Sequence, residues 1–108
     1  MPTSTAVQPI QQAAQTNLES LIRGVDFSSQ LSFGETLSGA TVTATYYSGG
    51  ADPNPQAIIG GPPVTLKTQA LQRISGGLPG TAYKLAFVVH TSLGNTFEGL
   101  VYFWVSQG

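Results

Sequence analysis

From residue 24 onward the sequence alternates between apolar and polar residues, and this period of two constrains the fold more than any other feature. Residues 40–46 place two alanines, a valine and a tyrosine on one side and three threonines on the other. Successive side chains of a β-strand point to opposite faces, so the pattern predicts a strand with one buried and one hydrated face. Residues 83–91 and 97–105 repeat the pattern with larger apolar side chains. The chain is therefore predicted to be mainly β.

Shorter apolar stretches between glycine- and proline-containing turns add further strands. Together with the three long ones they make about seven, if a short edge piece at residues 57–59 is counted. Such spacing, without helices between the strands, predicts an all-β fold, an antiparallel sandwich of the immunoglobulin-like (Ig-like) type. Residues 48–63 contain four prolines and four glycines. Proline cannot donate a hydrogen bond to a sheet, so this stretch is predicted to be a long loop.

The segment before the β-pattern has a different period. Over residues 9–22, apolar side chains recur at spacings of three and four, which predicts one amphipathic helix. The stripe consists of Ile10, Ala14, Leu18, Leu21 and Ile22. Residues 1–8 are predicted to form a flexible arm. We therefore divide the chain into an N-terminal arm and helix, residues 1–23, and an Ig-like β-sandwich domain, residues 24–108.

Residue types that support chemistry are scarce. The 108 residues include four Lys and Arg, five Asp and Glu, one histidine and no cysteine, and the net charge is −1. The basic residues are scattered, so neither nucleic acid nor an anionic membrane is an expected partner. The acids are far apart in sequence, and His90 is expected near the end of a strand, on its outer face. We predict that the chain is not an enzyme and holds no metal or cofactor. Neither a signal peptide nor a membrane span is predicted.

The most specific local pattern is Gly-Leu-Pro-Gly-Thr-Ala-Tyr at residues 77–83. A tyrosine that begins a late strand, just after a Pro-Gly turn, is typical of the tyrosine corner of Greek-key sandwiches, where the phenol bonds to the backbone at the crossover. We predict this structural role for Tyr83.

The last strand has apolar residues on both of its faces. One face carries Phe97, Val101 and Phe103, and the other carries leucine, tyrosine and tryptophan at 100, 102 and 104. An apolar second face needs a cover. The open covers are the N-terminal helix folded back, a loop, and another subunit or partner, and aromatic residues of this kind are enriched in interfaces. The predicted interface consists of Ile10, Leu18, Leu21, Ile22, Leu100, Tyr102 and Trp104.

Four motifs in the β-region resemble those of the small Ig-like virion proteins of tailed bacteriophages. They are Val-Asp-Phe-Ser-Ser-Gln-Leu at 25–31, Gly-Glu-Thr-Leu at 34–37, the Gly-Gly and Gly-Thr-Ala-Tyr of 76–83, and Thr-Ser-Leu-Gly-Asn-Thr at 91–96. The resemblance implies a structural virion subunit without catalytic residues, of the decoration, collar, neck or tail-associated type. Its implied partners are copies of itself, as a symmetric oligomer, and other virion proteins. The implied location is the virion, after a soluble stage in the host cytoplasm.

The sequence departs from that pattern in its helical N-terminal arm and its long middle loop. These departures leave the position in the virion open. A second hypothesis is an Ig-like or fibronectin-like binding module that recognises carbohydrate or another protein on a cell or phage surface. Tyr46, Tyr47 and Trp104 are its candidates for stacking against sugar rings. Carbohydrate is possible as a partner, although the sequence does not indicate it.

Overall fold

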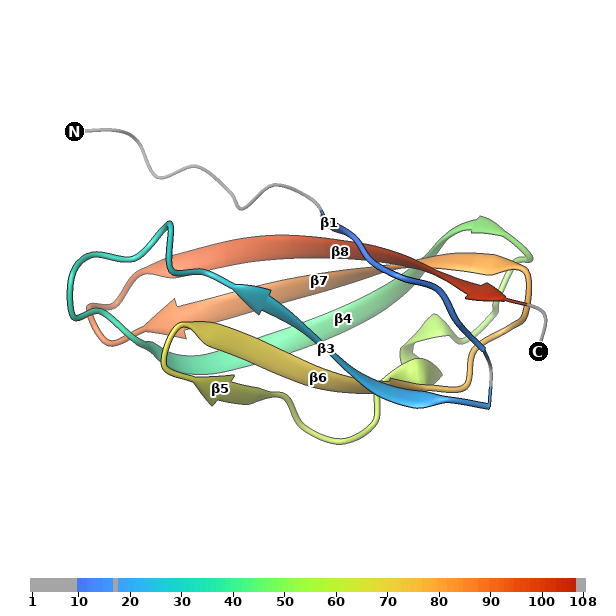
Figure 1. Ribbon diagram of the computed structural model, residues 1–108, viewed down its shortest axis with the longest axis horizontal. Coiled ribbons are helices and arrows are strands. Elements are labelled where there is room, and N and C mark those ends of the chain that lie inside the picture. Colours follow the sequence, from blue (N-terminus) through green and yellow to red (C-terminus); the bar gives the residue numbers. More distant parts are fainter. Residues whose placement is uncertain (1–9, 17, 107–108) are drawn as a thin grey trace.

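The computed structural model describes residues 10–16 and 18–106, and this part of the chain is built from short and long strands (Figure 1). Residues 1–9, which contain the predicted arm and Pro9, lie outside the described residues, as do Asn17 and residues 107–108. The elements in chain order are β1 (Ile10–Gln11), β2 (Gln15–Thr16), β3 (Ser20–Asp26), β4 (Leu37–Gly49), the 3₁₀ turn η1 (Pro55–Ile58), β5 (Val64–Leu66), β6 (Gln69–Ser75), β7 (Thr81–Thr91) and β8 (Thr96–Ser106).

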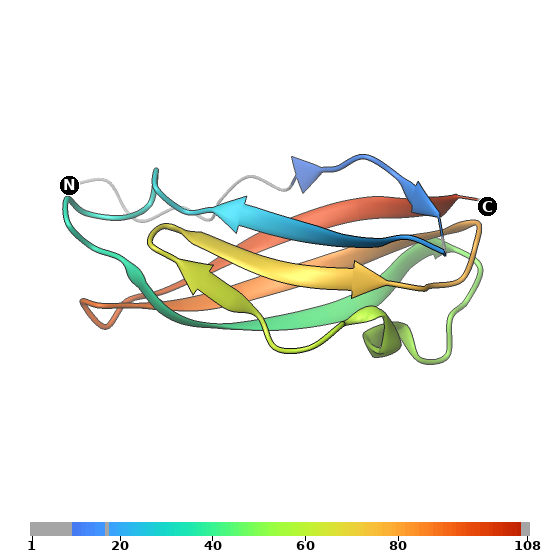
Figure 2. The ribbon, with the colours of Figure 1, turned by 60° about the horizontal axis from the view of Figure 1, so that its bottom comes forward.

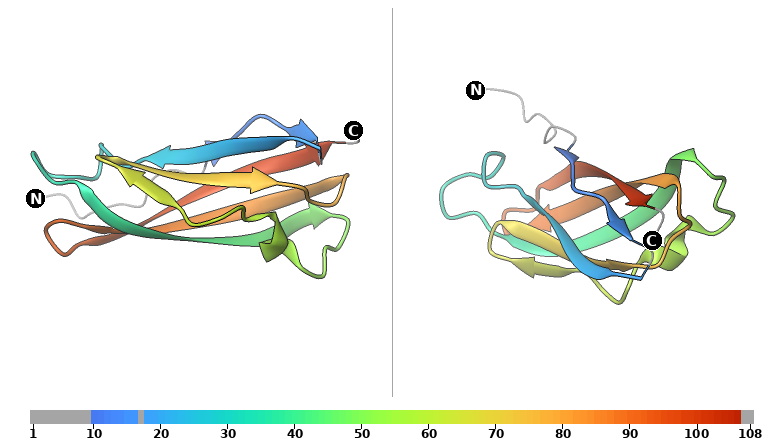
Figure 3. Two further views of the ribbon diagram at one scale, coloured as in Figure 1. Left: turned by 90° about the horizontal axis from the view of Figure 1, so that it is seen from below. Right: turned by 45° about the vertical axis from the view of Figure 1, so that its right-hand side comes forward.

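The strands form two sheets that pack face to face, which confirms the predicted all-β sandwich (Figures 2 and 3). The larger sheet has the order β1-β8-β7-β4, with β2 also paired to β8, and the smaller sheet has the order β3-β6-β5. The long strands β4, β7 and β8 pair antiparallel, whereas β1 and β2 run parallel to β8. Each long strand spans the full length of the sandwich, so its two ends lie at opposite ends of the molecule.

The period of two sorts the side chains of the long strands between the core and the surface. Tyr83, Leu85, Phe87 and Val89 of β7 are completely buried, and so are Val101, Phe103 and Val105 of β8. The three threonines of β4 point outward and are exposed. Burying a large apolar side chain contributes about 1.5–3 kcal/mol, so this inner face is the main source of stability. The core consists of Val25, Phe27, Leu37, Val42, Ala44, Ile58, Ala70, Ile74, Tyr83, Leu85, Phe87, Val89, Val101, Phe103 and Val105.

The helix predicted for residues 9–22 is wrong. Within residues 10–16 and 18–22 the chain instead forms β1 and β2 and then crosses to the smaller sheet as the start of β3. This path supplies hydrogen-bond partners to the edge of β8; for example, the Gln12 N–H donates to the Tyr102 carbonyl at 2.8 Å. A docked helix has no free backbone groups along its length with which to pair that edge. Strand pairing therefore replaces the helix.

The predicted apolar stripe is not what this segment buries. Leu18 is 87% exposed, and Leu21 and Ile22 are also on the surface. The segment buries Gln15 and Arg23 instead, and two of the guanidinium nitrogens donate to the Gln15 side-chain oxygen at 3.0 and 2.9 Å.

The Arg23 guanidinium also lies over a core aromatic ring. Its central carbon is 4.2 Å from the centre of the Phe103 ring, a cation–π contact. A third nitrogen donates to the side-chain oxygen of Gln12 at 3.2 Å. Burial lowers the pKa of Arg23, and the nearby charge of Glu19 opposes that shift. The arginine thereby ties the N-terminal segment to both sheets.

The middle loop also differs from its prediction in two places. β4 extends through Gly49, and the edge piece expected at residues 57–59 is mostly the 3₁₀ turn η1, with only Ile59 forming an isolated bridge to Ile74. Within η1, the Gln56 side chain lies along the outer edge of β4. It accepts from the Ala44 N–H at 2.8 Å and donates to the Val42 carbonyl at 3.4 Å. One amide thus closes the middle of an edge strand.

The division of the chain at residues 23 and 24 stays a prediction. β3 runs through that point from Ser20 to Asp26, paired along its whole length with β6.

Candidate interaction surfaces

Tyr83 lies at one end of the sandwich, near the start of β7, and its hydroxyl makes two hydrogen bonds. It accepts from the Leu78 N–H at 2.7 Å and donates to a carboxylate oxygen of Asp52 at 2.6 Å. Burial, and then the bond to Asp52, raise the pKa of Tyr83 to about 12. The ring stacks on Phe103 with 5.8 Å between centroids. These contacts join two loops to the core, and the assignment of a tyrosine corner stays a prediction.

Glu35 plays a comparable part at the opposite end. Its carboxylate accepts from the Thr91 hydroxyl, from the Asn95 amide at 2.8 Å and from the Ser32 N–H at 2.8 Å. These bonds lower the pKa of Glu35, and the one from Thr91 has the largest effect. The carboxylate therefore fastens the loop before β4 to the β7–β8 hairpin.

Two apolar side chains stand out from these fastened loops. Phe33 is fully exposed in the loop before β4, and Leu93 is exposed at the tip of the hairpin. A second pair of bonds holds the loops together, because the N–H of Ser92 donates to the Thr36 carbonyl and the N–H of Thr36 donates to the Ser92 hydroxyl. We call Phe33 and Leu93 the tip pair. Sequence reasoning missed it, although Glu35 lies in one of the motifs quoted above.

The outer face of the larger sheet carries the apolar side chains on the second face of β8, for which the sequence left several covers open. Leu100 and Tyr102 are half-buried, and Trp104 is 40% exposed. Tyr47, at a bulge in β4, leans over to Tyr102 with 4.7 Å between ring centroids and 69° between the planes. This edge-to-face geometry is a favourable aromatic contact. The four residues make a partly exposed apolar surface, which we call the β8 face.

The predicted interface residues do not come together in one place. Leu100, Tyr102 and Trp104 lie on the β8 face, whereas Leu21 and Ile22 belong to β3 in the other sheet. Leu18 lies between β2 and β3, and the side chain of Ile10 is outside what the structure describes.

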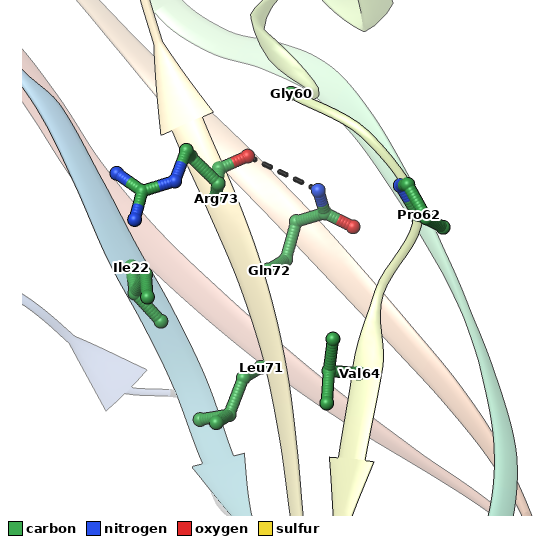
Figure 4. Close-up of a pocket in the computed structure, with 7 residues that line it drawn as sticks. All are labelled: Ile22, Gly60, Pro62, Val64, Leu71, Gln72 and Arg73. Carbon is green, nitrogen blue, oxygen red and sulfur yellow. Dashed lines mark hydrogen bonds between the residues drawn. The ribbon is translucent and has the colours of Figure 1, made fainter.

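Ile22 borders a shallow cleft of about 320 Å³ on the smaller sheet (Figure 4). The Gln72 amide forms its inner wall and donates to the carbonyls of Gly61 and Arg73 at 3.0 and 3.1 Å. The Gln72 oxygen is buried and has no hydrogen-bond partner among the described residues. The Arg73 guanidinium is bound to the carbonyl and hydroxyl of Ser20. Leu71, Val64 and Pro62 give the cleft an apolar lining.

Reactive groups do not gather in the part of the chain that the structure describes. Across residues 10–16 and 18–106, no three histidine, cysteine or acidic residues lie close enough together to hold a metal ion. The same residues contain no helix long and apolar enough to cross a membrane. What the surface does offer is apolar side chains on rigid strands and fastened loops. Fold and surface together define a small β-sandwich protein with exposed apolar side chains.

Comparison with known protein families identifies the family of the chain. Residues 15–103 match the model of the family described as podophage GP4 fiber-tail adaptor protein gp77, and the chain belongs to this family. No curated protein matches the chain. Membership confirms the resemblance to small virion proteins of tailed phages. The chain is a structural protein associated with a phage tail.

Proposed function

We propose that this chain is an adaptor subunit that joins a fibre to the tail of a podophage, with separate protein-binding surfaces at the two ends of its sandwich. The family description names such an adaptor. The body is elongated, with extents of 44 × 25 × 21 Å. The observation that carries the proposal is that exposed apolar side chains gather at both ends.

At one end the tip pair is held ready for binding. Glu35 and the reciprocal bonds between Thr36 and Ser92 fix the loops that carry Phe33 and Leu93. Loops that are already ordered lose less conformational entropy when they bind, so an apolar contact there contributes more to affinity.

At the opposite end, Tyr46, Tyr47, Leu78 and Trp104 are exposed around the Tyr83 region. Tyrosine and tryptophan are typical anchors of protein interfaces. β4, β7 and β8 run continuously between the two ends, so no hinge separates them. The two ends therefore keep a fixed position relative to each other. A rigid rod with an anchor at each end is what an adaptor requires.

The strand order supports the Ig-like arrangement that we include in the proposal. β3, β6 and β5 face β8, β7 and β4, and a tyrosine begins the second-to-last strand, as in Ig-like sandwiches. Symmetric oligomerisation and docking on a tail or capsid ring also belong to the proposal. Both fit a subunit with a low charge and a partly apolar sheet face.

The test replaces apolar side chains at each end and examines phage particles assembled with the variant chain. One variant carries Phe33→Ser and Leu93→Ser, and the other carries Tyr46→Ser and Leu78→Ser. Mass spectrometry of purified particles measures this chain and the fibre protein. We expect variants at one end to give tails that lack the chain and the fibre. Variants at the other end should give tails that keep the chain and lose the fibre.

Val64→Ser is the matched control, because Val64 is an exposed apolar residue on the body away from both ends. Its particles should be normal. Particles with the full complement of chain and fibre in both end variants would overturn the adaptor proposal. The proposal would also be overturned if both end variants lost the chain from the particles and neither kept the chain while losing the fibre. That result would show a single binding surface.

A carbohydrate-binding module is the second candidate, favoured by the exposed aromatic rings of Tyr47 and Trp104 on one face. Sugar rings stack on such side chains. Titration of the chain with purified host surface polysaccharide should then quench the fluorescence of Trp104, the single tryptophan. An unchanged signal would exclude this candidate.

A further inference from the structure

The charges on the outer face of the larger sheet are arranged in a way that suits a second copy of the chain. β4, β7 and β8 contain one lysine and one acid between them, Lys84 and Glu98. Both belong to the outward set, because their neighbours Tyr83, Leu85 and Phe97 point to the core. The rest of the outward set consists of threonines, serines and apolar residues, apart from His90 at one end.

Strand register places the two charges symmetrically about a central apolar pair. Ala86 of β7 lies opposite Leu100 of β8. Two residues along in one direction Lys84 lies opposite Tyr102, and two residues along in the other direction Glu98 lies opposite Val88. At about 3.3 Å per residue, the two charges stand roughly 13 Å apart along the strands, too far for an ion pair within one copy.

We propose that two copies of the chain pair face to face through this surface, about a two-fold axis that crosses the strands at Ala86 and Leu100. Rotation about such an axis reverses the strand direction, so Lys84 of each copy comes to the level of Glu98 of the other. The interface is isologous, with two reciprocal ion pairs around an apolar centre. An axis along the strands would bring like charges to the same level instead, so the charges select one geometry.

The size of the face suits this pairing. Three strands of about eleven residues, spaced by about 4.8 Å, give a surface of roughly 36 by 14 Å. That is about 500 Å² per copy in projection, so two faces together reach the ~1,000 Å² that a specific interface requires. The amphipathic helix that was expected to cover β8 does not exist among residues 10–16 and 18–22. Among the other covers, a second copy of the chain is the one that the arrangement of Lys84 and Glu98 favours.

This pairing goes beyond the adaptor role and is tested separately from it, on the purified chain. Light scattering measures the mass of the wild-type chain, of Lys84→Glu and of Glu98→Lys. We expect a dimer for the wild type and a roughly tenfold or greater weakening for each single variant, because each brings two pairs of like charges together. A mixture of the two variants should restore dimers, since every contact in a mixed pair is again between opposite charges.

Lys67→Glu is the control for charge reversal, because Lys67 lies in the turn between β5 and β6, away from the face. Its dimer should equal that of the wild type. Ala86→Arg, at the centre of the face, should abolish pairing, and circular dichroism checks that each variant is folded.

Four results would overturn the proposal. They are a monomeric wild type, single variants that dimerise like the wild type, a mixture that dimerises no better than either variant alone, and a monomer that dimerises only when residues 1–9 are removed. The last would mean that the N-terminal segment of the same chain covers the face. None of these results bears on whether the ends of the sandwich bind tail and fibre, which is measured in particles.

Discussion

Both ends of the sandwich have loops that are fixed by the hydrogen bonds of one side chain, but the two side chains differ in chemistry. At one end a phenol, Tyr83, joins two loops to the core, and at the other end a carboxylate, Glu35, joins a loop to a hairpin. Tyr83 is a donor and an acceptor, and its ring stacks in the core against Phe103. Glu35 acts only as an acceptor and gathers three donors.

The difference shows how each end depends on its surroundings. The Tyr83 end is stabilised mainly by burial of the apolar ring, and hydrogen bonds add to this. Substitutions that change the size of the buried side chain should therefore have the largest effect on stability there. The Glu35 end rests on charge-assisted hydrogen bonds, which need an ionised carboxylate. One end should therefore be sensitive to alkali and to cavities, and the other to acid.

The largest effect is expected from Tyr83→Ala. It removes a fully buried ring and leaves the Leu78 N–H and Asp52 without their partner, which should lower the free energy of unfolding by about 3–5 kcal/mol. Tyr83→Phe keeps the ring and loses the hydroxyl, so it should cost about 1–2 kcal/mol. Urea denaturation of both variants measures the two values. Equal losses would show that the ring contributes nothing beyond its hydroxyl.

Glu35→Gln should destabilise the chain less than Tyr83→Ala, and only where Glu35 is ionised. Because folding lowers the pKa of Glu35 below its ordinary 4.5, its contribution is complete above that value and is lost as the pH falls through the folded pKa. The difference in unfolding free energy between wild type and Glu35→Gln should thus shrink between pH 6 and pH 3.

The alkaline counterpart is the comparison of wild type with Tyr83→Phe. Folding raises the pKa of Tyr83 from 10.0 to about 12, so the contribution of the hydroxyl is complete below pH 10 and is lost as the pH rises through about 12. Denaturation midpoints measured across both pH ranges test the contrast. A pH-independent difference for either variant would contradict the role assigned to that side chain.

The smallest effects compare two glycines, one near each end. Gly94 in the hairpin has φ +81° and open space where a Cβ would lie, so Gly94→Ala should cost only the left-handed backbone, roughly 1–2 kcal/mol. Gly77 has φ +97°, and a Cβ there would lie 3.1 Å from Val105 and 3.3 Å from the Tyr83 ring. Gly77→Ala should therefore lower the thermal midpoint further than Gly94→Ala. The reverse order would show that the Tyr83 end is the more adaptable one.

The long strands could be predicted from the sequence because their inward residues are almost all apolar. In β7 the alternation from Tyr83 to Val89 matches the buried set without exception. The N-terminal segment could not be predicted in the same way, because the residues it buries are Gln15 and Arg23. A pattern that counts only apolar residues misses a polar side chain whose partners come from distant strands.

The candidate surfaces show the same limit. The apolar outer residues of β8 were visible in the sequence, because both of its faces are apolar. The tip pair was not, since Phe33 stands alone in a polar loop and its setting depends on contacts between Glu35 and residues about sixty positions away. The family match covers residues 15–103 and so includes the tip pair and the β8 face up to Tyr102, but not Trp104.

The side chain of Gln56 has a consequence for how copies of this chain can grow into larger structures. An unprotected edge strand adds further strands without limit and leads to ribbons and fibrils. The Gln56 side chain is hydrogen-bonded to the Val42 carbonyl and the Ala44 N–H, so another strand cannot pair with the middle of β4. An isologous contact between two faces, by contrast, closes at two copies. A single glutamine thereby favours a particle component of finite size over an open-ended aggregate.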